Sequence, residues 1–270
     1  MKMTDVTEKK YICRGCGHEL KGNPPISNYC FKCMLRTDYD LKLNNPELVM
    51  EQLEDIFSFF VADVNSAFEK DPAANTLIEV LTCYPGIHAV LIHRIAHLMW
   101  NLGIPFIPRY LNLLSHQLTG VDIHPGAKIG ERFFIDHGTG VVIGETAEIG
   151  DDVTMYQGAV LGGTSLDPVK RHPTLKNNIV VGAGAKILGP ITIGNNVQIG
   201  ANSVVTKNIP DNSIVVGVPG QIVTEDRDMK EDVEQFCHDE LPDPVQKILQ
   251  DLSERITKIE KSMSSKSPHG

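Results

Sequence analysis

The sequence predicts an α+β protein in which α-helices precede a long solenoid of short β-strands. Three observations lead to this prediction. Two C-x-x-C pairs lie near the start of the chain, apolar residues then follow a helical spacing, and from Val121 they recur every six positions. We therefore expect a zinc ribbon-like module over residues 1–42, an α-helical domain over 43–119, a parallel β-helix over 120–223, and a tail with an amphipathic helix over 224–270.

The overall charge and the absence of long apolar runs argue against several classes of protein. The 270 residues carry a formal net charge of -9, whereas a nucleic-acid-binding protein concentrates basic residues on one surface. The stretch MKMTDVTEKK lacks the apolar core of a signal peptide. No apolar run approaches the roughly 18 residues that span a membrane. We expect a cytoplasmic protein that binds neither nucleic acid nor membranes.

The first four cysteines form two pairs, Cys13 with Cys16 and Cys30 with Cys33. Two such pairs can present four thiolates tetrahedrally to one Zn²⁺, and disulfides are rare in cytosolic proteins. Four protein ligands leave no coordination position open for a substrate. The pattern therefore predicts a structural zinc site, with a redox dithiol pair as the alternative.

The helical region begins at Asn45-Pro46-Glu47, which combines a capping side chain, a proline in the first turn and an acid near the helix start. Asp71-Pro72 interrupts this first helix. Further helices are expected over residues 75–83, 87–102 and 107–118. His93 and His97 share one helix face, but their neighbours are apolar and no acid lies at a helpful spacing. We expect both histidines to be structural.

The solenoid is predicted from small and apolar residues that recur six positions apart. Three hexapeptides would form one triangular coil of about 18 residues, and coils would stack about 4.8 Å apart. In the second and third series another apolar residue follows two positions later. The series are Ile123, Ile129, Ile135 and Val141; then Val141, Ala147, Val153 and Ala159; then Ile179, Ala185, Ile191, Val197 and Ser203.

Two stretches depart from the hexapeptide pattern. In IDHGTG an acid and a histidine, Asp136 and His137, follow Ile135, where neighbouring repeats have glycine. Between the second and third series, a loop from Gly163 to Asn178 contains Lys170-Arg171-His172. An imidazole can accept and return a proton at neutral pH, and an arginine fork suits a carboxylate. Because functional residues concentrate in such insertions, we expect the active site here.

The motifs DIHPGAKIG, IDHGTGVVIGET, LGGTS, KRHP and GAGAKILGPI occur in the order of the serine O-acetyltransferase family, which the chain resembles from about Pro46 to Val223. The resemblance implies a left-handed parallel β-helix, an exception to the right-handed crossover rule. It implies transfer of acetyl from acetyl-CoA to the hydroxyl of L-serine, the first step of cysteine biosynthesis. It also implies a homotrimer or a dimer of trimers.

The same motifs imply the groups that move the proton. His137 matches the general base, and Asp122 matches the acid that orients its imidazole and stabilises imidazolium. His124 and His172 are the competing histidines. We expect His124 to make a structural hydrogen bond at a turn.

An amino-acid acceptor needs one site for its ammonium group and another for its carboxylate. Asp71 and Asp136 resemble the family's serine-contacting acids, and we expect them to receive the ammonium group. The fork of Arg171, beside His172, is expected to bind the carboxylate. Glu145 matches a family position near the site.

In the family, the thioester lies along the edge of the coil between subunits. Gly163, Ala183 and Ala201 are small residues that would let the pantetheine arm approach the backbone. Lys207 is the candidate for a phosphate contact.

Two other enzyme classes and one non-enzyme remain as alternatives. A γ-type carbonic anhydrase has the same β-helix but binds zinc through three histidines, for which His124, His137 and His172 would be candidates. An O-acetyltransferase for another small hydroxyl acceptor, such as homoserine or a sugar, is nearer. A zinc-ribbon adaptor on an inert scaffold would leave the acids and histidine near residue 136 unexplained. The helical region and KRHP favour serine.

The tail contains DPVQKILQDLSERITKIEKSM, in which Asp243-Pro244 marks a helix start. Spacings of four and three separate Val245, Leu249, Leu252, Ile256, Ile259 and Met263. This pattern predicts a trimeric helical bundle, with a helix folded back on its own chain as the alternative. Many serine acetyltransferases bind O-acetylserine sulfhydrylase through a terminal isoleucine. The sequence ends in SKSPHG, so we expect no stable complex with that enzyme.

Overall fold

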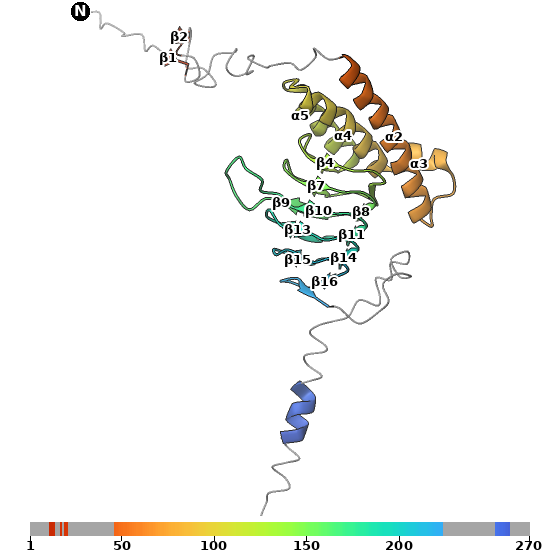
Figure 1. Cartoon of the computed structure of the whole chain (residues 1–270), viewed down its shortest axis with the longest axis vertical. Helices are drawn as coiled ribbons and strands as arrows, with labels where there is room; N and C mark the ends of the chain where they lie inside the picture. The colour runs from red at the N-terminus through yellow and green to blue at the C-terminus, as the bar shows by residue number, and fades with distance from the viewer. Residues whose placement is uncertain (1–10, 14–16, 18, 21–45, 224–251, 260–270) are drawn as a thin grey trace, which may run out of the picture.

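The computed structural model describes residues 11–13, 17, 19–20, 46–223 and 252–259. Figure 1 shows helices packed across one end of a column of stacked strands. This arrangement confirms the expected order of a helical region followed by a solenoid. In the described parts of the chain, no helix combines the length and the apolar character needed to cross a lipid bilayer.

The helical region contains four helices. They are α2 (Pro46–Lys70), α3 (Leu77–Cys83), α4 (Pro85–Asn101) and α5 (Ile107–Thr119). Their bounds agree closely with the predicted ranges. The hydroxyl of Thr76 caps α3 by accepting a hydrogen bond from the Glu79 N–H at 3.1 Å. Both α4 and α5 have proline in the first turn, where no backbone donor is lost.

The solenoid is a triangular parallel β-helix with three sheets, called here faces 1, 2 and 3. Face 1 contains β3 (Asp122–Ile123), β6 (Val142–Ile143), β9 (Val160–Gly162), β12 (Lys186–Leu188) and β15 (Val204–Val205). Face 2 contains β4 (Lys128–Ile129), β7 (Glu148–Ile149), β10 (Thr174–Leu175) and β13 (Thr192–Ile193). Face 3 contains β5 (Phe134–Ile135), β8 (Val153–Met155), β11 (Ile179–Val181), β14 (Val197–Ile199), β16 (Ile214–Val216) and β17 (Gln221–Ile222), which pairs antiparallel with β16. Corners 1–2, 2–3 and 3–1 join the faces in chain order.

The residues of the six-residue series fill the interior of the column. All of them are buried except Ile129 and Ile191, which are partly buried. Each coil repeats the same phase, so apolar side chains stack on those of the coil below and form one continuous core. A smaller core of Val64, Ala67, Val80, Ile87 and Phe134 joins the helices to face 3.

Two coils are longer than the hexapeptide rule requires, and their extra residues lie at different corners. Asp122 pairs with Val142, twenty residues later, whereas Val142 pairs with Val160, eighteen residues later. The two additional residues lie at corner 3–1, in the segment 136–140. Val160 pairs with Lys186, twenty-six residues later, and the additional residues form the loop between β9 and β10 at corner 1–2. Figure 1 shows this loop projecting from the side of the column away from α3.

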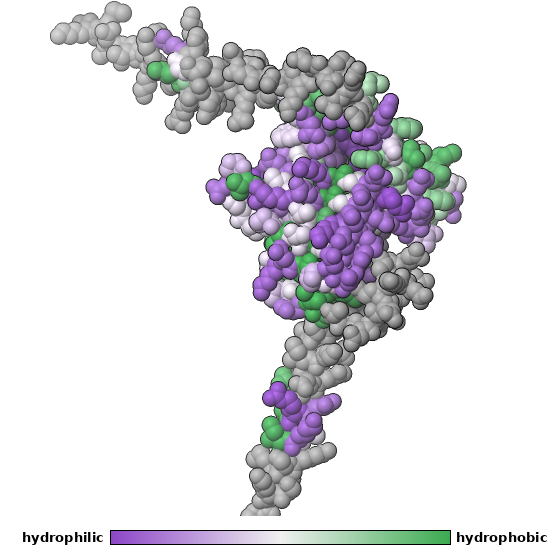
Figure 2. Space-filling view, in the orientation of Figure 1, coloured by the Kyte–Doolittle hydropathy of each residue, from purple (hydrophilic) through white to green (hydrophobic). Residues whose placement is uncertain are grey.

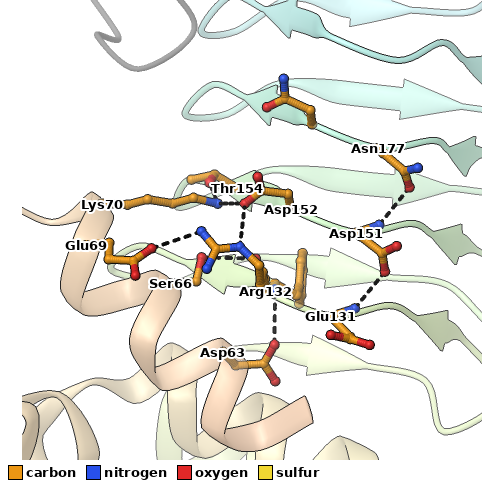
Figure 3. Close-up of polar contacts among 12 residues, drawn as sticks. Asp63, Ser66, Glu69, Lys70, Glu131, Arg132, Asp151, Asp152, Thr154 and Asn177 are labelled. Carbon is orange, nitrogen blue, oxygen red and sulfur yellow. Dashed lines mark hydrogen bonds and ion pairs between the residues drawn. The ribbon is translucent and has the colours of Figure 1, made fainter. Parts of the chain in front are cut away.

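Polar side chains fix α2 to corner 2–3 of the column (Figure 3). Asp63 is fully buried and accepts hydrogen bonds from Arg94 Nε at 2.8 Å and from the Phe133 N–H at 2.9 Å. At the end of the helix, Lys70 Nζ lies 2.8 Å from Asp152 Oδ1 and 3.2 Å from Thr154 Oγ1. The residue after Lys70 is therefore held close to the second coil.

The ends of the chain are described only in part. Strands β1 (Tyr11–Ile12) and β2 (Glu19–Leu20) pair antiparallel, and between them the Gly17 N–H donates to the Cys13 carbonyl at 2.9 Å. Cys13 is buried, while Cys16, Cys30 and Cys33 lie outside the described residues. Among the residues that are described, no three His, Cys, Asp or Glu side chains form a metal-binding group. Residues 252–259 are helical, and the rest of the predicted tail helix lies outside the described part.

Candidate active site

The first coil presents a histidine outside the column at corner 3–1. After β5 the Asp136 N–H continues the ladder by donating to the Met155 carbonyl at 2.9 Å. His137 then takes a positive φ of 57°, which is uncommon for a residue with a side chain. Its side chain is 75% exposed, and Nε2 lies 4.0 Å from Asp136 Oδ1. The two-residue excursion therefore places an imidazole and a carboxylate together at the surface.

A second carboxylate, Asp71, lies near Asp136. Asp71 follows α2, and its Oδ1 accepts the Ala73 N–H at 2.8 Å while Oδ2 accepts the Tyr84 hydroxyl at 2.5 Å. Burial raises the pKa of Asp136, the charge of His137 opposes this shift, and the charge of Asp71 adds to it. Two carboxylates in a partly buried site repel each other, and a bound cation relieves that repulsion. We call Asp71 and Asp136 the acid pair.

At corner 1–2, the loop between β9 and β10 brings Arg171 against Glu145. Arg171 Nη2 lies 2.5 Å from Glu145 Oε2, and Nη1 donates to the Asp167 carbonyl at 3.2 Å. The Thr146 hydroxyl accepts the Arg171 N–H at 3.0 Å, and the Thr146 carbonyl accepts Lys170 Nζ at 2.7 Å. The His172 N–H also donates to the Thr146 hydroxyl at 3.1 Å, so the loop is bound to the preceding coil on both sides of the arginine.

His172 is buried at the same corner. Its Nδ1 accepts a hydrogen bond from the Thr146 N–H at 3.2 Å, so the proton of the neutral ring is on Nε2. Burial lowers the pKa of His172, and the positive charge of Arg171 adds to this effect. The ring lies against Gly144, where a Cβ would fall 2.0 Å from Nε2. Any side chain at residue 144 would displace the ring.

The structure brings together two groups of the predicted site residues, but not in one place. Asp136 and His137 lie at corner 3–1, while Glu145, Arg171 and His172 lie at corner 1–2. Face 1 separates the two corners within each coil. Within the described part of one chain, the two groups therefore lie on opposite sides of face 1.

Asp122 and His124 lie on and beside β3, under the helices. Asp122 Oδ1 accepts Asn112 Nδ2 of α5 at 3.1 Å, and no hydrogen bond between Asp122 and His137 is found within the described chain. His124 Nδ1 accepts the Gly126 N–H at 2.9 Å. Burial lowers the pKa of His124 to about 4, and the positive charge of Arg109 contributes to that shift. His124 thus makes the structural turn contact expected from the sequence.

The residues expected along the thioester slot divide between the same two corners. Ala183 and Ala201 lie one coil apart at corner 3–1, where the Asn202 N–H donates to the Ala183 carbonyl at 2.8 Å. Gly163 follows β9 at corner 1–2, beside Arg171 and His172. Lys207 is exposed after β15.

Sequence reasoning did not single out three residues of these clusters: Tyr84, Thr146 and Tyr156. Thr146 follows Glu145 in the motif GET, so the same motif that indicated Glu145 could have indicated Thr146. Tyr84 lies thirteen residues after Asp71, beyond α3, and no rule of helix or strand spacing predicts a contact between the two residues. Burial raises the pKa of Tyr156, and the charges of the acid pair add to that shift, which places Tyr156 near both carboxylates.

Comparison with known proteins identifies relatives over most of the chain. A family model described as bacterial transferase hexapeptide (six repeats) matches residues 172–207. The serine acetyltransferase of Synechococcus elongatus is 50% identical over 205 residues, which cover 76% of this chain and 83% of the relative. That of Mycobacterium tuberculosis is 57% identical over 161 residues, which cover 60% of this chain and 70% of the relative.

Solved structures show a similar fold. The crystal structure of Neisseria gonorrhoeae serine acetyltransferase in complex with serine matches with a TM-score of 0.62 and 36% sequence identity. The match covers 68% of this chain and 79% of that chain.

Proposed function

The chain belongs to the serine acetyltransferase family, which acetylates the hydroxyl of L-serine in the first step of cysteine biosynthesis, and we propose that corners 3–1 and 1–2 are the two halves of its active site. The observation that carries this proposal is the excursion at residues 136–140. It is an insertion in an otherwise regular coil, and it exposes an imidazole beside a carboxylate.

His137 acts as the general base. As the serine Oγ attacks the thioester carbonyl carbon of acetyl-CoA, Nε2 of His137 accepts the hydroxyl proton. The tetrahedral intermediate then collapses, the carbon–sulfur bond breaks, and the imidazolium returns the proton to the departing thiolate. Asp122 orients the imidazole and stabilises its protonated form in the assembled enzyme. The exposed position of His137 supports this role, since a base must reach a substrate.

The two corners supply opposite charges for the two ends of serine. The ammonium group binds between Asp71 and Asp136, whose mutual repulsion it relieves. The carboxylate binds at Arg171 and at Nε2 of His172, which carries the ring proton. Glu145 holds the guanidinium in place through their 2.5 Å contact. This pattern supports an amino-acid acceptor over a sugar, which has neither charge.

A homotrimer would complete the site. Three left-handed columns around an axis parallel to their length would bring corner 3–1 of one chain against corner 1–2 of the next, giving three shared sites. The division of the site residues between two corners supports this assembly. Exposed apolar side chains of α2 and α3, including Phe57 and Ile78, support further pairing into a dimer of trimers. Figure 2 shows hydrophobic residues gathered over α3.

Acetyl-CoA lies along the edge of the column between chains. Gly163, Ala183 and Ala201 are small residues at the corners that would face each other in the trimer, which supports close approach of the pantetheine arm. Lys207, which is exposed, contacts a phosphate of the coenzyme.

A structural Zn²⁺ is held by Cys13, Cys16, Cys30 and Cys33. The antiparallel pairing of β1 and β2 on either side of the first C-x-x-C pair supports this proposal, because a short hairpin commonly carries such a pair in zinc ribbons. Metal analysis of the purified protein should find about one zinc per chain. A protein free of zinc would contradict the proposal.

The tail helices associate as a trimeric bundle. Residues 252–259 are helical, and the seam side chains Leu252 and Ile256 are 44% and 55% exposed in one chain, which supports contact with the same stripe of neighbouring chains.

The acceptor specificity is tested with a thiol-release assay. Full-length protein and acetyl-CoA are incubated with L-serine, L-homoserine, maltose or no acceptor. We expect release of CoA with L-serine well above the other three. Preference for maltose, or equal rates with all acceptors, would overturn the proposed function.

A further inference from the structure

Tyr84 lies at the junction of α3 and α4, next to the acid pair. It is the C-cap of α3 and also the N-cap of α4, with φ of -90° and ψ of 110°. Pro85 favours this extended conformation because a proline disfavours helical geometry in the residue before it. The backbone conformation at Tyr84 is therefore set by the local sequence, and its ring packs against the small core between the helices and face 3.

The same junction lies directly against the strand that leads to His137. A Cβ at Gly86 would fall 2.1 Å from the Ile135 carbonyl oxygen, so a residue without a side chain is required for α4 to approach β5 this closely. Ile135 immediately precedes Asp136. Tyr84 is thus part of a segment that is packed against the catalytic corner.

The hydroxyl of Tyr84 completes the hydrogen bonding that fixes Asp71. It donates to Oδ2 at 2.5 Å, while the Ala73 N–H donates to Oδ1 at 2.8 Å. One donor on each oxygen sets the rotation of the carboxylate and leaves other lone pairs for a ligand. Burial raises the pKa of Tyr84, and its hydrogen bond to Asp71 adds to the shift, so the hydroxyl stays protonated and remains a donor.

The backbone on the other side of Asp71 is fixed independently. Lys70 is bound to Asp152 and Thr154 of the second coil, as Figure 3 shows. The Asp71 N–H also donates to the Ala67 carbonyl at 3.0 Å. With the backbone anchored in this way, the remaining freedom of Asp71 is rotation of its side chain, which is the freedom that Tyr84 removes.

We propose that Tyr84 is a positioning residue for the acceptor: its hydroxyl holds Asp71 in the orientation in which the acid pair receives the ammonium group of serine. This inference rests on the proposed function, because it takes the acid pair as the ammonium site. The ammonium group does not react, so its contacts are the same in the ground state and the transition state. Loss of Tyr84 is therefore expected to change the KM for serine and leave kcat unchanged.

The test compares full-length wild type with Tyr84→Phe, which keeps the packed ring and removes only the oxygen. The KM for serine should rise about tenfold, the effect of losing one hydrogen bond to a charged acceptor. The KM for acetyl-CoA and kcat should not change. In an Asp71→Ala background the same substitution should have no further effect, because Tyr84 acts through that carboxylate.

Thr82→Val is the matched control. It removes a hydroxyl two residues away whose hydrogen bond stays within α3, to the Ile78 carbonyl at 2.7 Å, so the KM for serine should not change. A second pair, Tyr84→Gln and Tyr84→Leu, contrasts a side chain that can donate with one that lacks a donor. We expect the lower KM for serine in the glutamine variant, and this pair serves if Tyr84→Phe proves unstable.

Three results would overturn the positioning role in an enzyme that acetylates serine. They are an unchanged KM for serine in Tyr84→Phe, equal values in the glutamine and leucine variants, and an equal rise with and without Asp71. A wild-type protein that acetylates no serine would instead refute the proposed function, and the inference with it.

Discussion

Breaking the buried ion pair between Asp63 of α2 and Arg94 of α4 is expected to loosen the helices from the column. The two side chains are 0% and 4% exposed, with Arg94 Nη2 2.7 Å from Asp63 Oδ2. Arg94 also donates to the Ile129 carbonyl at 3.2 Å and the Gly130 carbonyl at 2.7 Å, so the pair connects two helices to the first coil. Asp63→Asn keeps the shape but replaces one accepting oxygen with an NH₂ group, so a donor would face either Arg94 Nε or the Phe133 N–H where water does not reach.

Removing one partner of a buried, hydrogen-bonded pair costs about 3–5 kcal/mol. For a folded unit of this size, each 1 kcal/mol lowers Tm by about 2–4 °C, so Asp63→Asn should lower Tm by roughly 6–20 °C. Replacing both residues, as in Asp63→Leu with Arg94→Met, should recover much of that loss because neither charge is left unpaired. Lys176→Met, which removes an exposed pair with Asp211 at 3.5 Å, is the control and should leave Tm unchanged.

The pH dependence of Tm provides a second test, which uses the single variant Arg94→Met. Burial raises the pKa of Asp63 to about 6 even though Arg94 opposes the shift. A carboxyl whose pKa is raised in the fold stabilises it when protonated, and this stabilisation is lost as pH rises through the folded pKa. Arg94→Met removes the opposing charge, so it should destabilise less near pH 5 than near pH 8. A shift in Tm below about 2 °C for Asp63→Asn would refute the reasoning, as would an Arg94→Met penalty independent of pH.

Three further predictions concern the site itself. His137→Ala should lower kcat by about 10²–10⁴-fold with Tm unchanged, and near-wild-type turnover would contradict its role as base. Gly144→Ala should displace the His172 ring and raise the KM for serine, and unchanged kinetics would show that the ring can move without consequence. Asp136→Asn should abolish serine binding yet raise Tm near pH 8, because a raised pKa means that the fold disfavours the charge and loses stability as pH rises through that pKa. A lower Tm for Asp136→Asn would contradict this sign.

The column could be predicted because each hexapeptide repeats the same pattern of apolar and polar residues. Residues such as Ile143, Leu161 and Ile187 lie in the same phase of successive coils, so one observation about the period predicted the burial of all three. The start of α2 was predicted for a similar reason, since proline and capping residues act within a single turn.

The arrangement of the site could be predicted only in part. The motifs pointed to His137 and Arg171, but the period alone did not show that their insertions lie at different corners of the triangle. That result depends on the strand register, which fixes where the two additional residues near Asp136 and the longer loop near Arg171 leave the coil. The contact between Tyr84 and Asp71 depends on how α3 and α4 meet the column, which no pattern in the sequence encodes locally.

If the active site is shared between two chains, two inactive variants should restore activity when they assemble into the same trimer. A site within one chain would show no such complementation. His137→Ala destroys corner 3–1 and leaves corner 1–2 intact, while Arg171→Ala does the reverse. If each site combines corner 3–1 of one chain with corner 1–2 of the next, a mixed trimer contains some sites built from the two intact corners. An equal mixture, unfolded and refolded together, should recover about one quarter of the wild-type activity, because a site is intact only when each of its two chains supplies the undamaged corner. The two variants refolded separately and mixed afterwards are the control and should stay inactive. Failure of the co-refolded mixture to gain activity, with mixed trimers shown to form by tag exchange, would mean that His137 of one chain and Arg171 of the next do not form a shared site.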